Sequence, residues 1–326
     1  MKALVYEGVE TLVYRYMPDP VPGLGQSLVK IAASGICGSD MHAYLGHDER
    51  RPAPLILGHE AAGVVQGGEF DGKRVTINPL TTCGLCAACK AGRDNLCADR
   101  MIISMPPREG AFGDMVIMAN RNLVDVPADV PFAKAALAEP LACGWHAVRL
   151  GSEALDTPLA DARCVVIGGG AIGVGAALCL AAFGATDIKV VEPNAVRRAT
   201  LDTIDGFTAV APGAVMQADL VIDGVGYAAT RADATAITRP GGVIMHIGLG
   251  EGTGGLDIRR MTLQEITFIG TYTYTAQDFR DTAAAIFDGR LGALDWTEER
   301  PLSEGAKAFA DIRAGVVAAP KIILRP

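Results

Sequence analysis

A glycine-rich turn near the middle of the chain constrains the fold more than any other feature of the sequence. The apolar run Cys164–Ile167 has the length of a short buried strand, and an Ala-rich helical stretch follows the turn. Glycines at positions 168, 170 and 173 permit a tight turn, close approach of backbone to a pyrophosphate, and close packing of helix on strand. The N–H groups at the start of such a helix also favour phosphate. The predicted dinucleotide contacts here are Gly168, Gly170, Ala171, Ile172 and Gly173.

A carboxylate follows this turn at the distance that a dinucleotide site requires. The next apolar run, Ile188–Val191, ends in Glu192, about twenty residues beyond the glycines. A carboxylate at this point accepts hydrogen bonds from both hydroxyls of the adenosine ribose and repels a 2′-phosphate, so it favours NAD over NADP. Arg197 and Arg198 soften this preference, because a nearby arginine can accommodate a phosphate.

The alternation of apolar runs with helical stretches from about residue 140 is typical of a doubly wound parallel sheet. Asp219–Ile222 and Val243–Ile247 are further strands, and each is followed by glycine-containing turns. Ligands of such sheets lie beyond the carboxyl ends of the strands, which predicts cofactor contacts from Val225, Gly248 and Leu249. His246 lies within an apolar strand and is interpreted as a satisfied core histidine.

The first 140 residues are rich in short strands separated by Pro and Gly, as in an all-β, barrel-like domain. The predicted strands are Leu28–Ile31, Gly63–Val65, Arg74–Ile77 and Met115–Met118. Beyond residue 271 the sequence predicts helices at Asp278–Gly289 and Glu304–Arg313 and a final strand at Lys321–Leu324. This tail is expected to return to the first domain.

Four cysteines in the β-rich part have the spacing of a metal site. Two residues separate Cys83, Cys86 and Cys89, and seven separate Cys89 from Cys97. Four thiolates at this spacing can enclose Zn²⁺ in a tetrahedron that leaves no position for a substrate, so the prediction is a structural zinc. An iron–sulfur site is the alternative, because ferredoxin-type sequences also use cysteine pairs two residues apart.

A second group of potential ligands lies in two separate segments. Cys37-Gly38-Ser39-Asp40-Met41-His42 and Gly58-His59-Glu60 offer a thiolate, an imidazole and a carboxylate, which is the mixed donor set of a catalytic zinc. The chain around both segments is expected to form loops, where a β-scaffold usually presents its functional side chains.

Composition excludes several classes of partner. The net charge of −8 is spread over interspersed acidic and basic residues, so nucleic acid and anionic membranes are not expected as partners. No apolar run is long enough to span a bilayer, and the N-terminus lacks the apolar stretch of a signal peptide. Eight cysteines without an export signal favour thiols and metal over disulfides, and hence a cytoplasmic location.

These motifs, in this order, resemble those of the zinc-dependent medium-chain dehydrogenase/reductase family, most closely its sorbitol (polyol) and threonine dehydrogenase branch. The resemblance includes Glu139-Pro140-Leu141 and extends over the whole chain. It implies a GroES-like β-barrel catalytic domain (1–141 and 272–326) and a Rossmann domain (142–271).

The resemblance also implies roles for individual residues. Catalytic zinc would be bound by Cys37, His59 and a glutamate, either Glu60 or Glu139, with Cys143 as a further alternative to Glu139. Asp40 would orient His59 as an acceptor beyond the ligand shell. Ser39 and His42 would pass the proton of the substrate to solvent, and Glu60 would act beside the ion.

The activity that the resemblance implies is hydride transfer between NAD(H) and a secondary alcohol or polyol, or the matching ketone, with two zinc ions per subunit. The partner is then a small-molecule alcohol or ketone. A homodimer or homotetramer is expected through edge strands of the Rossmann sheet, with Val243–Ile247 or Leu256–Ile258 at the contact. Because Arg50 and Arg51 can bind phosphate, a phosphorylated substrate is not excluded. The alternatives are a zinc- and dinucleotide-binding structural or sensor protein without turnover, and a zinc-free quinone reductase of the same fold.

Overall fold

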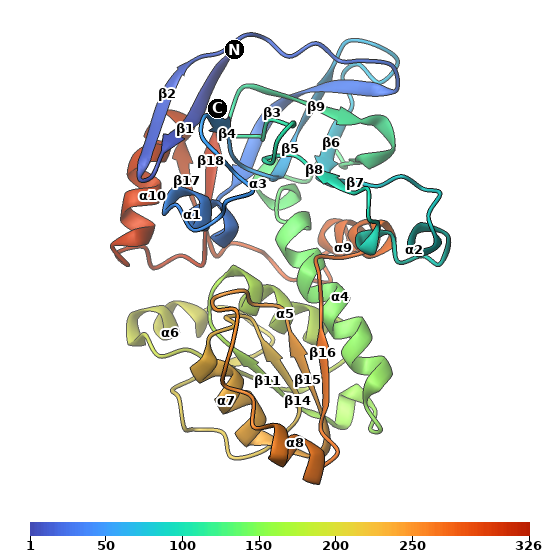
Figure 1. Cartoon of the computed structure of the whole chain (residues 1–326), viewed down its shortest axis with the longest axis vertical. Helices are drawn as coiled ribbons and strands as arrows, with labels where there is room; N and C mark the ends of the chain where they lie inside the picture. The colour runs from blue at the N-terminus through green and yellow to red at the C-terminus, as the bar shows by residue number, and fades with distance from the viewer. The chain divides into compact units, whose positions relative to one another are not determined.

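The computed structural model describes residues 1–326, which form two compact units. The first unit contains Met1–Glu139, Thr275–Asp288 and Thr297–Pro326, and the second contains Pro140–Tyr274 and Gly289–Trp296. Figure 1 shows most of the second unit as the green to orange ribbon. The predicted domain boundaries place residues 289–296 in the first domain, whereas these residues pack with the second unit. The exact domain definition therefore stays a prediction.

The first unit is built on a mostly antiparallel sheet that joins both ends of the chain. Its strand order is β10-β6-β5-β3-β18-β17, and β9 also pairs with β3. The bounds are β3 Gln26–Gly35, β5 Glu60–Gln66, β6 Arg74–Ile77, β9 Met115–Ala119, β10 Leu123–Asp125, β17 Thr297–Pro301 and β18 Lys321–Arg325. The final strand β18 pairs with β3 at Ile323↔Gly35 and Leu324↔Ser34. This pairing brings residues more than 280 positions apart into one sheet.

Two smaller sheets and several helices complete the first unit. The small sheets have the orders β2-β1-β4 and β7-β8, with bounds β1 Lys2–Gly8, β2 Thr11–Tyr16, β4 Leu55–Ile56, β7 Leu80–Thr81 and β8 Met101–Ile102. The helices are α1 Gly38–Tyr44, α2 Ala87–Lys90, α3 Phe132–Ala135, α9 Ala276–Phe287 and α10 Gly305–Arg313. Phe309 of α10 packs its ring against those of Tyr44 and Phe112, with centroid distances of 5.3 and 5.9 Å. Aromatic pairs at such distances add to the stabilisation from buried area.

The second unit contains a six-stranded parallel sheet of order β13-β12-β11-β14-β15-β16. Its bounds are β11 Arg163–Ile167, β12 Asp187–Val191, β13 Thr208–Val210, β14 Ala218–Asp223, β15 Thr238–His246 and β16 Thr267–Gly270. The helices are α4 Ala138–Ala154, which begins in the first unit, α5 Ala171–Ala182, α6 Ala195–Leu201, α7 Ala228–Ile237 and α8 Ile258–Leu263. The central strands are buried on both faces, as parallel strands with helical crossovers require.

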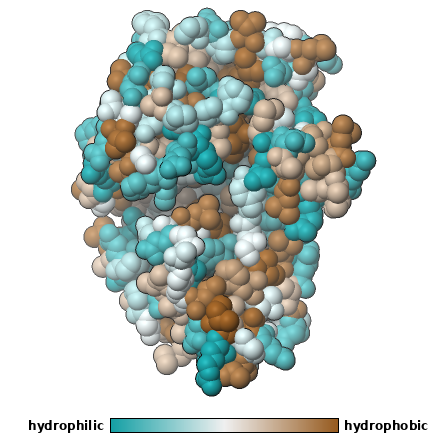
Figure 2. All heavy atoms as spheres, viewed as in Figure 1, coloured by the Kyte–Doolittle hydropathy of each residue, from teal (hydrophilic) through white to brown (hydrophobic).

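The predicted fold class, a GroES-like β-domain with a Rossmann sheet, is confirmed. Each predicted strand lies within an observed one except Val243–Ile247, because β15 ends one residue earlier at His246. The helix predicted at Asp278–Gly289 begins two residues earlier, because Thr275 and Asp278 form a capping box at its start. The expectation of loops around Cys37 is wrong in part, since Ser39 and His42 lie on the short helix α1. No helix has both the length and the apolar character needed to cross a membrane. On the face drawn in Figure 2, hydrophilic and hydrophobic residues are interspersed.

Candidate functional site

The four cysteines of the segment 83–97 converge on one point. The Sγ–Sγ distances are 3.5 Å for Cys86–Cys89 and Cys97–Cys83, and 3.9 Å for Cys83–Cys89. A tetrahedron of thiolates around zinc has S···S edges of about 3.8 Å. All eight cysteines of the chain are free, so none of these distances is a disulfide. The group has room for one ion but not for a multinuclear cluster.

Backbone N–H groups stabilise a thiolate in this group. Leu85 and Cys86 donate to the sulfur of Cys83 at 3.4 and 3.3 Å, and together they lower the pKa of Cys83 to about 6. A thiolate is the form that binds metal. The same lobe is tied to a helix, because both carboxylate oxygens of Asp94 accept from the N–H of Ala276 at the start of α9, each at 3.2 Å.

The second predicted cluster also forms. One ligand atom from each of Cys37, His59 and Glu60 lies within 4.8 Å of the other two. Edges of roughly 3.3–3.8 Å are expected around zinc with these donors, so small side-chain adjustments suffice. Cys37 is the residue before α1, Glu60 is the first residue of β5, and His59 directly precedes it. Sulfur, nitrogen and oxygen thus meet from two segments, as the sequence predicts.

Asp40 holds the two ligand segments together. Its Oδ2 accepts from the N–H of Cys37 at 3.0 Å, and its Oδ1 accepts from the N–H of Gly58 at 3.3 Å. The same Oδ1 lies 3.4 Å from Nδ1 of His59, although this contact is not aligned as a hydrogen bond. Asp40 is fully buried, so its charge acts at short range on His59. This is the position of a residue that orients a ligand histidine.

The charges around His59 shift its titration and that of Asp40. Burial alone raises the pKa of Asp40, but the neighbouring His59 and Arg51 outweigh it and lower the pKa to about 2. Burial alone lowers the pKa of His59, whereas the charges of Asp40 and Cys37 raise this pKa well above its ordinary value. The shift of His59 shows that negative groups surround this imidazole, and an arrangement of this kind favours a bound cation.

Glu60 occupies an unusual setting that sequence reasoning did not reveal. Its Oε1 accepts from the ammonium of Lys321 at 2.6 Å, and Lys321 also donates to the carbonyl of Ile36 at 2.8 Å. Its Oε2 is buried without a hydrogen-bond partner. A Cβ at Gly35, the residue opposite Glu60 in β3, would stand 2.0 Å from this oxygen, so a side chain there would displace the carboxylate from its present position. An orphaned buried carboxylate oxygen beside a thiolate and an imidazole is what a metal ligand requires.

Lys321 is a buried lysine whose positive charge is stabilised by neighbouring negative groups. Burial alone lowers its pKa, but the charges of Glu60, Cys37 and Glu139 raise the pKa above its ordinary value. The influence of Glu139 on Lys321 places this glutamate near the cluster, and Glu139 is itself 5% exposed. The only sequence signal for Lys321 was a cationic residue opening an otherwise apolar strand.

Helix α1 presents the two predicted relay residues. Ser39 and His42 are both partly exposed, and the carbonyl of Ser39 accepts from Arg51 at 2.7 Å. Arg51 is 2% exposed and also donates to the carbonyl of Ser104, so it supports this segment from inside. Arg51 is therefore engaged with backbone, and Arg50 pairs with Asp48. Both guanidinium groups are therefore already paired within this part of the chain.

The glycine turn of the second unit has the predicted geometry. Gly168 has φ +102°, and a Cβ at Gly173 would stand 1.8 Å from the carbonyl of Gly168. Gly170 precedes α5, whose first residues Ala171 and Ile172 are partly exposed. The turn therefore exposes the N-terminus of a 12-residue helix whose remaining length is largely buried. This is the arrangement that binds a pyrophosphate.

Glu192 follows β12 and is 3% exposed. Its Oε2 accepts from the N–H of Gly169 at 3.0 Å and lies 3.5 Å from Nη1 of Arg197, and its Oε1 accepts from the N–H of Asn194 at 2.8 Å. Arg198 donates instead to the backbone carbonyls of Glu192 and Pro193. A carboxylate beside the glycine turn fits a ribose, and Arg197 is the cation that reaches it.

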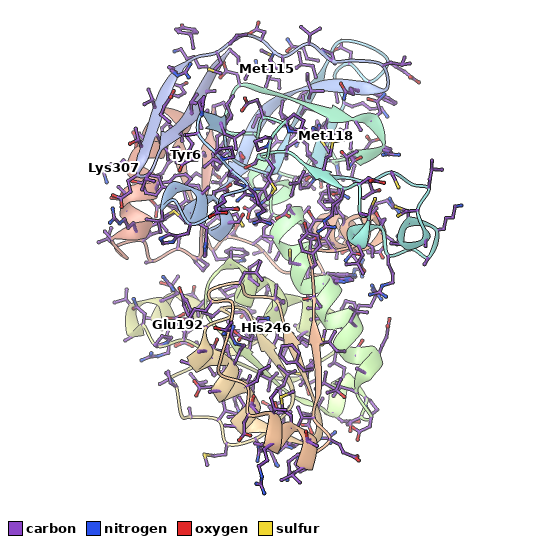
Figure 3. The ribbon with its side chains drawn as sticks, in the orientation of Figure 1. Tyr6, Met115, Met118, Glu192, His246 and Lys307 are labelled. Atoms are coloured by element: carbon purple, nitrogen blue, oxygen red, sulfur yellow. The ribbon has the colours of Figure 1, made fainter.

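The turns after β14 and β15 lie at the same end of the sheet. Asp223 accepts from the N–H groups of Val225 and Gly226, both at 2.9 Å, and its backbone carbonyl accepts from Gly248. His246 ends β15, and Figure 3 shows its side chain and that of Glu192 at this end of the sheet. The interpretation of His246 as a satisfied core histidine is wrong, because its Nε2 has no hydrogen-bond partner and lies 3.7 Å from Asp223.

A Rossmann sheet with a phosphate-binding turn, together with two metal-ready clusters in a β-domain, defines a zinc-containing oxidoreductase that uses a nicotinamide dinucleotide. Family models agree, since residues 23–128 match the alcohol dehydrogenase GroES-like domain and residues 171–288 match the zinc-binding dehydrogenase domain. The chain belongs to the zinc-dependent medium-chain dehydrogenase/reductase family, in the branch of the polyol dehydrogenases. It is an oxidoreductase that acts on alcohols.

Individual relatives support this assignment. L-galactonate-5-dehydrogenase of Escherichia coli K12 is 29% identical over 328 residues, which cover 95% of this chain and 94% of that protein. Sorbitol dehydrogenase of Bacillus subtilis 168 is 36% identical over 207 residues, or 60% of this chain and 57% of that protein. Among solved structures, one described as a zinc-binding dehydrogenase of Sinorhizobium meliloti 1021, bound to NADP, is 26% identical with a TM-score of 0.89, covering 100% of this chain and 99% of that one.

Proposed function

We propose that this protein oxidises a secondary hydroxyl of a polyol or sugar acid to the ketone with NAD, or catalyses the reverse reduction. The observation that carries the proposal is the cluster of Cys37, His59 and Glu60, joined by Asp40. The relatives named for L-galactonate and sorbitol support a polyhydroxylated substrate. When bound, zinc supplies Lewis-acid polarisation of an oxygen, and the dinucleotide supplies the hydride acceptor.

The residues of this chain would divide the remaining work. Cys37 and His59 hold the ion, and Glu60 is the third ligand through Oε2, the oxygen that Lys321 leaves unengaged. The alternative to Glu60 as third ligand is Glu139. Asp40 fixes the orientation of His59. Cys83, Cys86, Cys89 and Cys97 hold the structural ion.

A proton must leave the substrate hydroxyl as it is oxidised. The hydroxyl of Ser39 can accept a hydrogen bond from it and donate one onward, and the partly exposed imidazole of His42 can exchange the proton with water. Both lie on α1, which begins directly after Cys37, so relay and ligand share one rigid support. His42→Gln is then expected to slow turnover more at low pH, where hydroxide is scarce, than at high pH.

The decisive experiment is a panel of polyols, sugar acids and simple secondary alcohols with NAD or NADP, read as reduced-nicotinamide absorbance, on protein of measured zinc content. Cys37→Ala is expected to lose one of two zinc ions and all turnover while still binding NADH. Cys143→Ala, at a partly buried cysteine outside both clusters, is the matched control and should retain both zinc ions and turnover. Normal turnover by Cys37→Ala would overturn the assignment, and Glu60→Gln beside Glu139→Gln shows which glutamate affects zinc content.

The preference for NAD rests on Glu192. Its carboxylate faces the glycine turn and repels a 2′-phosphate, while Arg197 at 3.5 Å weakens that repulsion. NAD is therefore the expected cofactor, with NADP used less efficiently. The NADP complex of the Sinorhizobium relative makes the comparison of the two cofactors essential.

A homodimer or homotetramer in the cytoplasm also belongs to this proposal. The free cysteines fit a reducing compartment. The contact expected at Val243–Ile247 is wrong, because β15 is paired on both sides, and Leu256–Ile258 forms no strand. The available edge on that side of the sheet is β16, whose residues are partly or fully exposed. Light scattering of the purified protein measures the state, and a monomer would contradict the proposal.

A further inference from the structure

The loop after β15 is unusual in composition and in how closely it is packed. Five of the eight residues from Gly248 to Gly255 are glycines. Such a segment loses much conformational entropy when it is ordered, so something must hold it. Its apolar residue Leu249 is 76% exposed, at the end of the sheet where ligands of this fold bind.

Several of the glycines allow the loop to lie directly on the backbone of the α7 region. A Cβ at Gly255, where φ is +87°, would stand 2.0 Å from the carbonyl of Ala228. A Cβ at Gly250 would stand 2.6 Å from the ring of Tyr227. The loop also caps α7, since the carboxylate of Glu251 accepts from the N–H of Ala228 at 2.8 Å. These close contacts fit the loop against the α7 region in one conformation.

One side chain holds that position. Arg231, on the second turn of α7 and 6% exposed, donates to four backbone carbonyls. These are Gly254 at 2.6 Å, Gly226 at 2.8 Å, Glu251 at 3.0 Å and Thr253. It thus joins the turn after β14 to the loop after β15. A planar guanidinium can bond several carbonyls at fixed angles, which an ammonium cannot do.

The sheet order indicates which half of a dinucleotide meets this loop. The glycine turn follows β11, and Glu192, the ribose-side carboxylate, follows the neighbouring strand β12. The strands β14 and β15 lie on the other side of β11. A dinucleotide whose pyrophosphate lies on the turn and whose adenosine lies toward β12 therefore extends its nicotinamide half toward Arg231 and the loop.

We propose that Arg231 is a positioning residue for the nicotinamide half of the cofactor: its four hydrogen bonds hold the loop Gly248–Gly255 in the conformation that binds this half. The inference rests on the proposed use of a nicotinamide dinucleotide. If the loop is held less often in the binding conformation, the apparent Kd rises in inverse proportion to the fraction that is competent. ADP-ribose, which lacks the nicotinamide, does not depend on the loop.

The test compares the affinities of NADH and ADP-ribose by calorimetry for the full chain and for Arg231→Lys and Arg231→Met. A tenfold loss of the competent fraction raises the Kd of NADH about tenfold for Arg231→Met, and less for Arg231→Lys, while that of ADP-ribose changes less than about twofold. Arg260→Met is the matched control, because Arg260 also donates to backbone carbonyls, those of Thr235 and Thr238, at the opposite end of β15. Arg260→Met should lower thermal stability and leave the ratio of the Kd values of NADH and ADP-ribose unchanged.

Gly255→Ala provides an independent route, since its Cβ lifts the loop from Ala228 and should also weaken NADH selectively. Unchanged NADH binding in the Arg231 variants, or equal losses for NADH and ADP-ribose, would assign Arg231 a merely structural role and overturn the inference. Failure of the unmodified protein to bind either ligand would instead overturn the proposed function. The two failures are therefore distinguishable.

Discussion

Replacement of Lys321 by methionine tests how the buried charges of the first unit are balanced. Methionine keeps the apolar length of the side chain and removes the ammonium. In the unmodified protein the Lys321 and Glu60 side chains are 4% and 0% exposed, and their charged atoms lie 2.6 Å apart. Removal of the cation leaves the carboxylate of Glu60 buried, with its other oxygen already unpaired.

The expected cost follows from this burial. Removing one partner of a buried ion pair costs about 3–5 kcal/mol in free energy of unfolding, because an uncompensated charge stays inside. For a unit of this size the loss lowers Tm by roughly 6–20 °C. Glu60→Gln in the same chain as Lys321→Met removes both charges and should recover a large part of the loss, as buried pairs replaced together are often nearly neutral.

Calorimetry on chelator-treated and zinc-loaded protein separates two explanations. If Glu60 lies at the ion, zinc itself compensates the carboxylate, so Lys321→Met should cost less in loaded than in chelated protein. A loss of under about 1 kcal/mol in chelated protein, the range of exposed pairs, would refute the argument that this pair is the sole compensation of Glu60. An identical loss in both states would argue against Glu60 as a ligand.

Three further changes test other parts of the structure. Burial raises the pKa of Asp219, but its hydrogen bonds from Arg163 outweigh this and lower the pKa to about 2; its stabilisation is therefore present above the ordinary value of 3.8 and lost as pH falls toward 2. Asp219→Asn should flatten the decline of Tm between about pH 4 and 2, and an unchanged decline would contradict the reasoning. Cys83→Ser should reduce zinc by about one ion per chain, measured by atomic absorption, and an undiminished content would exclude the four-cysteine site. Glu192→Ala leaves Arg197 without its carboxylate and should raise the ratio of kcat/KM for NADP to that for NAD by roughly tenfold, a change of about 1.4 kcal/mol; a constant ratio would remove Glu192 from cofactor selection.

Most of the functional prediction came from features that are local in sequence. The glycine turn at Gly168 is set by backbone conformation within a few residues, so its spacing could be read directly. The cysteines from Cys83 to Cys97 are also close in the chain, and only a tight lobe can bring them together. The cluster of Cys37, His59 and Glu60 comes from two segments, but each segment contains residue types that are recognisable as metal ligands.

The residues that sequence reasoning missed act across long separations or through plain backbone contacts. Lys321 reaches Glu60 only because β18 pairs with β3, and no spacing in the sequence encodes that register. Arg51 and Arg231 donate mainly to carbonyls, which every residue possesses, so their partners leave no signature. The interpretation of His246 was wrong for the same reason, because the hydrogen bonding of its ring depends on Asp223 in the neighbouring strand β14.

The sequence by itself determined the fold class, the two candidate metal-binding groups and the glycine turn, because each depends on short-range geometry and on side-chain chemistry that few other residues share. Tertiary structure alone decided which buried charges compensate one another and which side chains support the site. Those interactions depend on strand register and on distances between residues that are remote in the chain, and a change of one position in register would replace every partner.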